Sequence, residues 1–415
     1  MPGRVWDKVG SVSLSQHHTS DGPVPARILF WLSASVGVTM VGMGIIWPIM
    51  PLYAIQLGAG GTELGFIIAA FNLARSVFNP VVGRLSDRLG RKPFMLTGLF
   101  CYALLSVAYI QSASVAGLIA VRFAHGLAAV CVAPVAMAVV AETAPPRRLG
   151  IYMGTLSMAL MLGVGAGPLL GGVIKDWLGT EAAFLTMGGL ALVTSVGILV
   201  FVPSLARKAG ETVKPSTSMR QTLRQSRILQ TVFSIRFFSA VGQGAVYTFL
   251  PLYGVAIGIS STQVGILLGV NVLLIAFLQR PGGRLADRTR PVALMVGGIV
   301  LSGLAVAGMP LVQNFSGALV MNILMGVANG IAVPAALVLA GREGARVGMG
   351  SVMGLFDAAL SLGFIVSPIL LGMVHDVFGI AAIFYVGGAI ILGGTLLVVM
   401  RFWSPWQPRS YHGDI

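Results

Sequence analysis

Long apolar runs and short polar gaps alternate along the whole chain. Twelve such runs span residues 28–57, 64–83, 94–112, 114–142, 151–177, 181–204, 229–257, 262–283, 292–312, 314–341, 348–375 and 378–402. A helix needs about 20 mostly apolar residues to cross the hydrocarbon core of a bilayer. The pattern therefore predicts an all-α membrane protein with 12 transmembrane helices, the longer of which tilt or protrude from the membrane.

Polar stretches set the boundaries of the predicted units. These units are an N-terminal tail at 1–27, a six-helix bundle at 28–204, a middle loop at 205–228, a second six-helix bundle at 229–402 and a C-terminal tail at 403–415. The N-terminal tail shows no cleavable signal pattern. The basic segment 218–230 fits two interpretations, an amphipathic helix lying on lipid head groups and a solvated linker.

The two bundles carry a sequence repeat with a constant offset of 200 residues. The matching positions are mostly glycines, prolines and loop residues, namely Pro51/Pro251, Tyr53/Tyr253, Gly83/Gly283, Asp87/Asp287, Gly126/Gly326, Pro134/Pro334, Pro168/Pro368, Asp176/Asp376 and Gly179/Gly379. Each half has an even number of predicted helices, so both halves enter the membrane in the same orientation. We therefore expect parallel repeats related by an axis along the membrane normal.

Composition supports a membrane location, and charge sets the orientation. Hydrophobic residues make up 56% of the chain and charged residues only 10%, against roughly 25% charged in a soluble protein. The net charge of +14 is concentrated in alternate short gaps and the middle loop, which is the positive-inside pattern rather than a nucleic-acid-binding surface. The expected location is the bacterial inner membrane as a multi-pass plasma-membrane protein, with both termini and the middle loop cytoplasmic. Nucleic acid is not an expected partner.

A glycine-basic motif, GRLSDRLGRKP at 83–93, lies between the second and third runs and recurs in shortened form, GRLADRTRP, at 283–291. Glycine lets helices approach closely, and an acid at a helix end can interact with the N-terminus of a neighbouring helix. The basic residues can pair with nearby acids, so a gating role and a pure topology signal both fit. The gating candidates are Gly83, Asp87, Arg88, Gly90, Arg91, Glu142, Gly283, Asp287 and Arg288.

A second motif lies in the fifth run, where residues 163–172 read GVGAGPLLGG. Small residues permit a tight helix crossing, and a proline removes one backbone hydrogen bond from the helix. The motif positions are Gly163, Gly167, Pro168, Gly171 and Gly172. Generic helix packing would explain these spacings equally well.

Together these motifs resemble the major facilitator superfamily. GRLSDRLGRKP is similar to its loop signature, and residues 163–172 resemble the G-x-x-x-G-P-x-x-G-G motif of its drug:proton antiporters. The first-run segment VGMGIIWPIMP at 41–51 is similar to tetracycline-type exporters, and Asp357, eleven residues before Pro368, to vesicular amine transporters. The resemblance implies the major facilitator fold, with 12 transmembrane helices in two pseudo-symmetric six-helix bundles, and export rather than import.

Two further positions bear on proton coupling in that family. Arg122-Phe-Ala-His125-Gly126 resembles its R-x-x-x-G motif, whose arginine is implicated in proton coupling. Many relatives also place an acid two residues before the V-G-x-G segment of the first helix, where this chain has Thr39. A proton-binding or cation-binding acid is therefore missing from the first run.

Four charged residues fall well inside predicted spans, namely Asp357, Arg75, Arg122 and Arg236. A charge near the bilayer centre costs at least about 2.5–3.5 kcal/mol on insertion scales, so each should face a cavity or a partner. None has a charged residue at offset 200. These charges are therefore not part of the repeated scaffold, which favours a role in substrate or proton binding over a structural role. Either the excess positive charge attracts anionic or zwitterionic substrates, or the arginines pair with Asp357 and backbone carbonyls and serve packing.

The proton-coupling candidates are Asp357, Arg122 and His125. An imidazole titrates near neutral pH, although a hydrogen-bonded packing histidine also fits position 125. The substrate-cavity candidates are the remaining deep polar or aromatic side chains, Trp47, Asn72, Arg75, Arg236, Gln243, Asn271, Asn322 and Asn329. For the amides, hydrogen bonding between helices is the alternative interpretation.

Motifs of enzymes, nucleotide sites and metal sites are missing from the sequence, and both cysteines lie inside apolar runs. No cofactor or metal is expected, so energy must come from a proton gradient or from the substrate's own gradient. We expect a secondary active transporter, not an enzyme, that exports small amphipathic molecules against inward proton flow, as in multidrug efflux. An importer or uniporter of an organic anion, a lipid or lysolipid transporter, and a transporter-like sensor are the alternatives. The expected partners are a small-molecule substrate, protons and the lipid bilayer, and the family resemblance implies a monomer.

Overall fold

The computed structural model describes residues 25–145, 148–203, 223 and 226–402. Within these residues the chain forms helices and short connections, and eleven helices are long and apolar enough to span a bilayer. A further long helix, α10 (Arg227–Ala256), has 30 residues, more than half of them buried. Its polar side chains, Arg236 and Gln243 among them, lower its hydropathy without removing it from the bundle. The prediction of an all-α fold with 12 transmembrane helices is confirmed.

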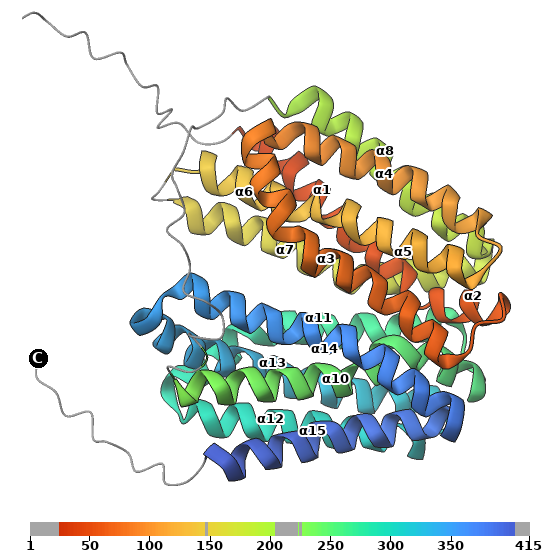
Figure 1. Ribbon diagram of the computed structural model, residues 1–415, viewed down its shortest axis with the longest axis vertical. Coiled ribbons are helices and arrows are strands. Elements are labelled where there is room, and N and C mark those ends of the chain that lie inside the picture. Colours follow the sequence, from red (N-terminus) through yellow and green to blue (C-terminus); the bar gives the residue numbers. More distant parts are fainter. Residues whose placement is uncertain (1–24, 146–147, 204–222, 224–225, 403–415) are drawn as a thin grey trace, which may run out of the picture.

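The two halves of the chain form two helical bundles, one above the other in Figure 1. The first bundle contains α1 (Ala26–Ile46), α2 (Met50–Gln56), α3 (Gly61–Leu89), α4 (Arg91–Gln111), α5 (Val115–Val130), α6 (Ala133–Thr143), α7 (Leu149–Leu178) and α8 (Thr180–Phe201). The second contains α10, α11 (Ser261–Arg288), α12 (Pro291–Gly308) with the 3-10 turn Met309–Leu311, α13 (Phe315–Val347), α14 (Met349–Phe378) and α15 (Ile380–Phe402). Segment 218–230, expected as a surface helix or linker, lies mostly outside the described residues, and both predicted tails do so almost entirely.

Two apolar runs that look continuous in sequence are each split into two helices. The first run breaks between α1 and α2, and the fourth breaks between α5 and α6. Each second segment starts with a proline in its first turn, Pro51 in α2 and Pro134 in α6. Proline has no N–H to donate and disfavours helical geometry in the residue before it, so it is tolerated best at a helix start.

The glycine-basic motif continues a helix instead of forming a loop. α3 runs to Leu89, six residues beyond the apolar run that ends at 83, because leucine and arginine are good helix formers outside the membrane as well. It stops at Gly90, whose φ of +100° is a conformation that side-chain-bearing residues rarely adopt. Hydropathy therefore underestimates the helix, and the residues GRLSDRL lie on its last two turns.

Several pairs of residues at offset 200 share a structural task. Gly179 and Gly379 link α7 to α8 and α14 to α15 with φ of +89° and +81°. The Tyr53 hydroxyl donates to the carbonyl of Tyr109 at 3.0 Å, and the Tyr253 hydroxyl donates to the carbonyl of Val312 at 2.7 Å. Each tyrosine thus ties its own helix to the end of the third span of its half, in α4 or just after the 3-10 turn that follows α12.

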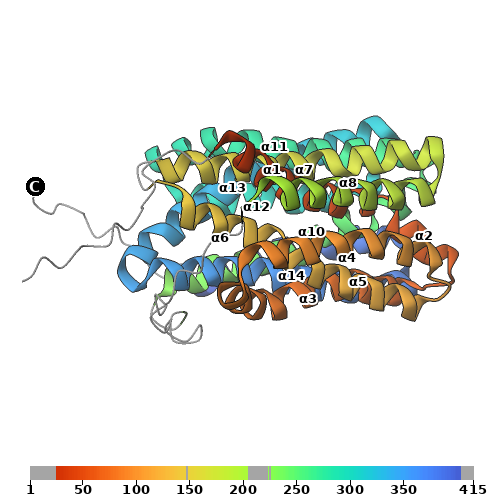
Figure 2. The same ribbon diagram turned by 90° about the horizontal axis from the view of Figure 1, so that it is seen from above.

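The bundles meet along two helix pairs, α3 with α14 and α7 with α11, which we call the seam. The two pairs lie on opposite sides of the molecule (Figure 2). We call the end of the molecule that carries Arg84, Arg88 and Arg91 the basic end, and the end that carries Asp176 and Asp376 the acidic end.

Backbones touch across the seam near the acidic end. A Cβ added to Gly65 would lie 2.3 Å from the Pro368 carbonyl oxygen, and a Cβ added to Gly265 would lie 2.4 Å from that of Pro168. Glycine is the residue type that permits such close approach. The two contacts are related by the offset of 200, so both sides of the seam close in the same way.

Toward the basic end the seam helices separate. Gly154 and Gly354 lie fourteen residues, about four helical turns, before Pro168 and Pro368, and so share their helix faces. A Cβ added to either glycine would meet nothing within 4 Å. Figure 1 shows the other seam pair, α3 and α14, diverging in that direction. The bundles are therefore joined at the acidic end and apart at the basic end.

Candidate functional site

Two guanidinium groups in the first bundle lie over one phenyl ring. The Cζ atoms of Arg122 and Arg75 are 4.8 Å and 5.6 Å from the ring centroid of Phe71. Arg122 is 1% exposed, and its Nε and Nη1 atoms have no hydrogen-bond partner. Arg75 is half-buried. Cation–π contact stabilises each guanidinium, but it supplies no negative charge.

His125 lies beside this pair of arginines, fully buried among aromatic rings. Its Nδ1 atom is 2.9 Å from the Tyr109 hydroxyl, and its ring centroid is 4.4 Å from that of Tyr102. The Nε2 atom is buried without a hydrogen-bond partner. His125 therefore combines a packing role with one free ring nitrogen, which has capacity for a further hydrogen bond or a proton.

Asp357 lies eight residues after the start of α14, about 12 Å along the helix. Its side chain is exposed. It precedes Phe364 by seven residues and Pro368 by eleven, so the three share one helix face. Phe364 accepts a hydrogen bond from Asn72 of α3, and Pro368 touches Gly65 of α3. Asp357 is thus on the face of α14 that meets the first bundle, in the half where the bundles are apart.

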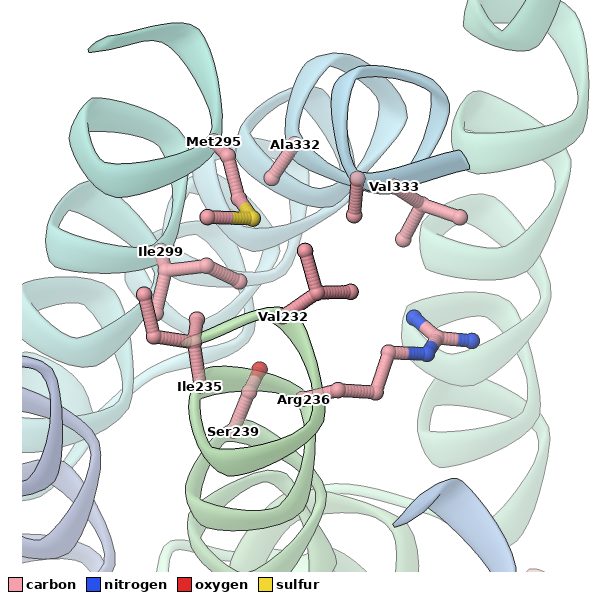
Figure 3. A pocket seen from close by; sticks show the side chains of 9 residues that line it. Val232, Ile235, Arg236, Ser239, Met295, Ile299, Ala332 and Val333 are labelled. Carbon is pink, nitrogen blue, oxygen red and sulfur yellow. The ribbon is translucent and has the colours of Figure 1, made fainter. Parts of the chain in front are cut away.

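Arg236 lies in α10 near Asp357 but forms no direct ion pair with it. The charge of Asp357 acts on Arg236, while the Arg236 Cζ atom is 4.2 Å from the ring centroid of Phe356. Its Nε atom has no hydrogen-bond partner. Figure 3 shows a small pocket enclosed by α10, α12 and α13, with the guanidinium pointing away from Met295 and Ile299. This pocket lies inside the second bundle, not at the seam.

The cavity candidates with amide side chains take two different positions. Asn72 is at the seam, where its Nδ2 atom donates to the Phe364 carbonyl at 3.5 Å. Asn271 and Asn322 are buried inside the second bundle, where Asn271 donates to the Asn322 carbonyl at 3.0 Å. The Tyr247 hydroxyl donates to the Asn271 side chain at 2.8 Å.

Gln243 and Asn329 hold helices of the second bundle together. The Gln243 amide donates to Asn329 Oδ1 at 2.9 Å, and Asn329 donates to the Ser302 hydroxyl at 3.1 Å. These bonds connect α10, α13 and α12, as expected if the amides form hydrogen bonds between helices instead of lining a cavity. Trp47 instead reaches across the bundles, with its ring centroid 5.4 Å from that of Tyr247.

At the basic end, Arg91 binds polar side chains of the first glycine-basic motif and of α6. Its guanidinium pairs with Asp87 and with Glu142, and it donates to the Ser86 hydroxyl at 2.7 Å. Glu142 is the partner that the sequence suggests. Among the described residues, Asp287 and Arg288 of the second motif form no comparable ion pair, which agrees with the loss of the Gly-Arg-Lys ending there.

The glycine-rich motif of α7 serves two helix crossings on two faces. Cβ atoms added to Gly163, Gly167 and Gly171 would lie 2.5–2.7 Å from the nearest α1 atoms. A Cβ on Gly172 would lie 2.2 Å from the Ser261 carbonyl oxygen of α11. One face of the motif therefore packs its own bundle, and the other closes the seam.

Two acids that the sequence places merely at helix ends join the bundles. Asp376, at the end of α14, accepts from the backbone N–H of Gly61 at 2.6 Å and of Thr62 at 2.9 Å. Asp176, at the end of α7, accepts from the N–H of Thr262 at 2.6 Å. The match of the two acids at offset 200 indicates that they share a role. The sequence does not indicate their partners, because each partner lies in the opposite half of the chain.

Comparison with known proteins gives the same fold and a family. The chain matches the Major Facilitator Superfamily over residues 32–256 and again over 232–413. It is 31% identical over 350 residues to an uncharacterized MFS-type transporter of Methanocaldococcus jannaschii, covering 83% of this chain and 90% of the relative. It is 25% identical over 380 residues to the multidrug resistance protein MdtG of Proteus mirabilis, covering 89% and 94%.

Among solved structures, a bacterial homolog of the human lysosomal transporter Spinster, in an inward-facing and unoccupied conformation, superposes with a TM-score of 0.78. Its sequence identity is 14%, and the match covers 93% of this chain and all of that one. At this identity the likeness concerns the fold alone. The sequence match spans nearly the whole chain, and the chain is a multi-pass membrane transporter that belongs to the Major Facilitator Superfamily.

Proposed function

We propose that this chain is a proton-coupled exporter of small amphipathic molecules that works by alternating access. The observation that carries the proposal is the position of Asp357. It is an acid within a spanning helix, exposed on the face of α14 that meets the first bundle. An ionisable residue inside a membrane span is costly and usually functional. The multidrug resistance relative supports export as the direction.

The shape of the seam supports alternating access. The backbones of the two bundles touch near the acidic end, and the bundles are apart at the basic end. One rigid-body rocking motion can therefore close the basic end and open the acidic end. By the positive-inside rule the basic end faces the cytoplasm, which puts the termini and the middle loop there. Asp357 would then take part in exchange by binding a proton in one state and releasing it in the other.

The test uses everted membrane vesicles in which respiration acidifies the lumen and a pH-sensitive dye reports the proton gradient. Ethidium and other fluorescent amphiphiles are added, and dequenching of the dye reports proton exit coupled to their transport. We expect Asp357→Asn to abolish the coupled dequenching. Glu181→Gln, an exposed acid at the start of α8, is the matched control and should retain it. Undiminished coupling in Asp357→Asn removes this residue from the mechanism.

A second candidate function, import or uniport of an organic anion, is favoured by the unpaired arginines at Phe71. It predicts counterflow of substrate without a pH gradient and no effect of proton ionophores. The same vesicles, loaded with substrate and clamped at equal pH on both sides, separate it from export.

A further inference from the structure

Arg75 and Arg122 bring two positive charges to a single ring. Their Cζ atoms are 5.6 Å and 4.8 Å from the centroid of Phe71. A guanidinium cannot be deprotonated in a protein, so both charges are permanent. Arg122 is 1% exposed, so its charge lies away from water beside a second cation, which is unfavourable unless a negative charge compensates it.

The depth of Arg75 prevents relief by the lipid head groups. It lies eleven and eight residues from the two ends of the apolar run 64–83, about 16 and 12 Å along the helix. A side chain near a helix end can extend its charge to the membrane surface, but Arg75 is too far inside to do so. Its compensating charge must come from within the protein or from a bound molecule.

The first bundle offers no acid at that depth within its described residues. Its acids lie at helix ends, namely Glu63, Asp87, Glu142, Asp176 and Glu181. Tyr102, Tyr109 and His125 surround the arginines and contribute hydroxyl and imidazole groups. These groups are hydrogen-bonding partners, not anions. Asp357 is in the second bundle, where its negative charge interacts with Arg236.

We propose that Arg75, Arg122 and Phe71 form a subsite for the anionic head group of an amphipathic substrate. This refines the proposed function by naming the chemical class of the substrate, a carboxylate, sulfonate or phosphate attached to an apolar body. Arg75, being half-buried, makes the first contact. Two nitrogen atoms of Arg122, Nε and Nη1, have no hydrogen-bond partner, and hydrogen bonds from a guanidinium to an anion are charge-assisted and strong.

Binding to the purified protein in phosphatidylcholine nanodiscs tests the subsite. Three fluorescent probes share one apolar body and differ in charge: dansylglycine is an anion, dansylamide is neutral and dansylcadaverine is a cation. We expect dansylglycine to bind most tightly. Arg75→Gln and Arg122→Gln should each weaken dansylglycine about tenfold or more and leave dansylamide unchanged.

Arg75→Lys keeps the charge and should retain part of the dansylglycine affinity, which a purely structural role for Arg75 would not predict. Arg280→Gln, at an exposed arginine of α11, is the matched control for lost positive charge and should bind like the unmodified protein. Equal affinity for all three probes, or unchanged dansylglycine affinity in both glutamine variants, would overturn the subsite.

Two sources can supply such an anion, a soluble molecule and a lipid head group. Replacing part of the phosphatidylcholine by phosphatidylglycerol distinguishes them. Competition with dansylglycine supports the subsite with a lipid head group as occupant, and its absence supports the subsite with a soluble organic anion.

The binding measurement needs no proton gradient, so the two proposals fail separately. If the protein binds dansylglycine through Arg75 but moves no protons, the anion subsite is supported and the proposal of proton coupling is wrong. A protein that exchanges protons for dansylcadaverine and ignores dansylglycine keeps the coupling and loses the subsite.

Discussion

Asp376 and Thr62 join the two bundles at the acidic end. The Asp376 carboxylate accepts hydrogen bonds from the Thr62 backbone N–H at 2.9 Å and from the Thr62 hydroxyl at 2.6 Å. Thr62 is in the first turn of α3, where N–H groups have no partner inside the helix and the helix dipole favours a negative charge. The end of α14 thus caps the start of α3, a residue 314 positions away.

The first prediction is that Asp376→Asn opens the acidic end. The asparagine keeps the size of the side chain but removes its charge, so charge-assisted bonds worth roughly 1–2 kcal/mol together are weakened. That energy corresponds to about a five- to thirtyfold shift in population toward the state open at the acidic end. Spin labels on cysteines placed at Gln56 and Ala256, both exposed at that end, report the shift as a longer interlabel distance.

Glu63→Gln is the matched control for this shift. Glu63 is also an acid in the first turn of α3, but it accepts from Gly60 of its own helix at 2.8 Å and does not cross the seam. It should leave the distance distribution unchanged. An equal response in the two variants would mean that the charge near the helix start, not the link between bundles, controls opening.

The second prediction concerns the paired acid, Asp176. It accepts from the backbone N–H of Ser261 at 3.3 Å and of Thr262 at 2.6 Å. The Ser261 bond is longer than either backbone bond of Asp376 at α3, which measure 2.6 Å and 2.9 Å, so we expect Asp176→Asn to shift the same label distance less than Asp376→Asn. The two sites share no partner, so the double variant should show the sum of the two free energies. A double variant no more open than Asp376→Asn alone would contradict two independent links.

The third prediction tests the backbone contact at the seam. A Cβ at Gly65 would lie 2.3 Å from the Pro368 carbonyl oxygen, and a backbone atom cannot rotate away. Gly65→Ala should therefore force α3 and α14 apart and cost about 1–3 kcal/mol, measured as a lower unfolding temperature in detergent and a wider label distance. Gly189→Ala in α8, where the added Cβ meets nothing within 4 Å, should be neutral or slightly stabilising because alanine favours helix.

Sequence patterns predict the helices and their two-fold arrangement because both depend on local properties. Apolar runs follow from the need of each span to cross the membrane, and the repeat follows from one helix order used twice. The break after Ile46 and the extension of α3 to Leu89 were not predicted, since hydropathy reports contact with lipid and not helical backbone.

The candidate site is predictable only in part, for a similar reason. A charge in an apolar run is visible in the sequence, so Asp357, Arg75 and Arg122 are found without a structure. Whether such a residue meets a partner depends on how distant helices pack. The shared Phe71 ring and the contact of Asp376 with Thr62 belong to this second kind, and neither has a local signal.

The last prediction concerns Arg91 at the basic end. One guanidinium pairs with Asp87 and Glu142 and donates to Ser86, and so ties the end of α3 to the end of α6. Lysine keeps the charge but offers a point charge in place of a planar fork of donors. Arg91→Lys should therefore lose about 1 kcal/mol of local stability and speed amide hydrogen exchange in residues 86–92 and 140–143 several-fold.

Arg84→Lys, an exposed position one turn before Arg88, controls for the substitution itself and should leave exchange unchanged. If both variants exchange at the rate of the unmodified protein, Arg91 contributes only its charge to orientation, which is the topology interpretation of the motif.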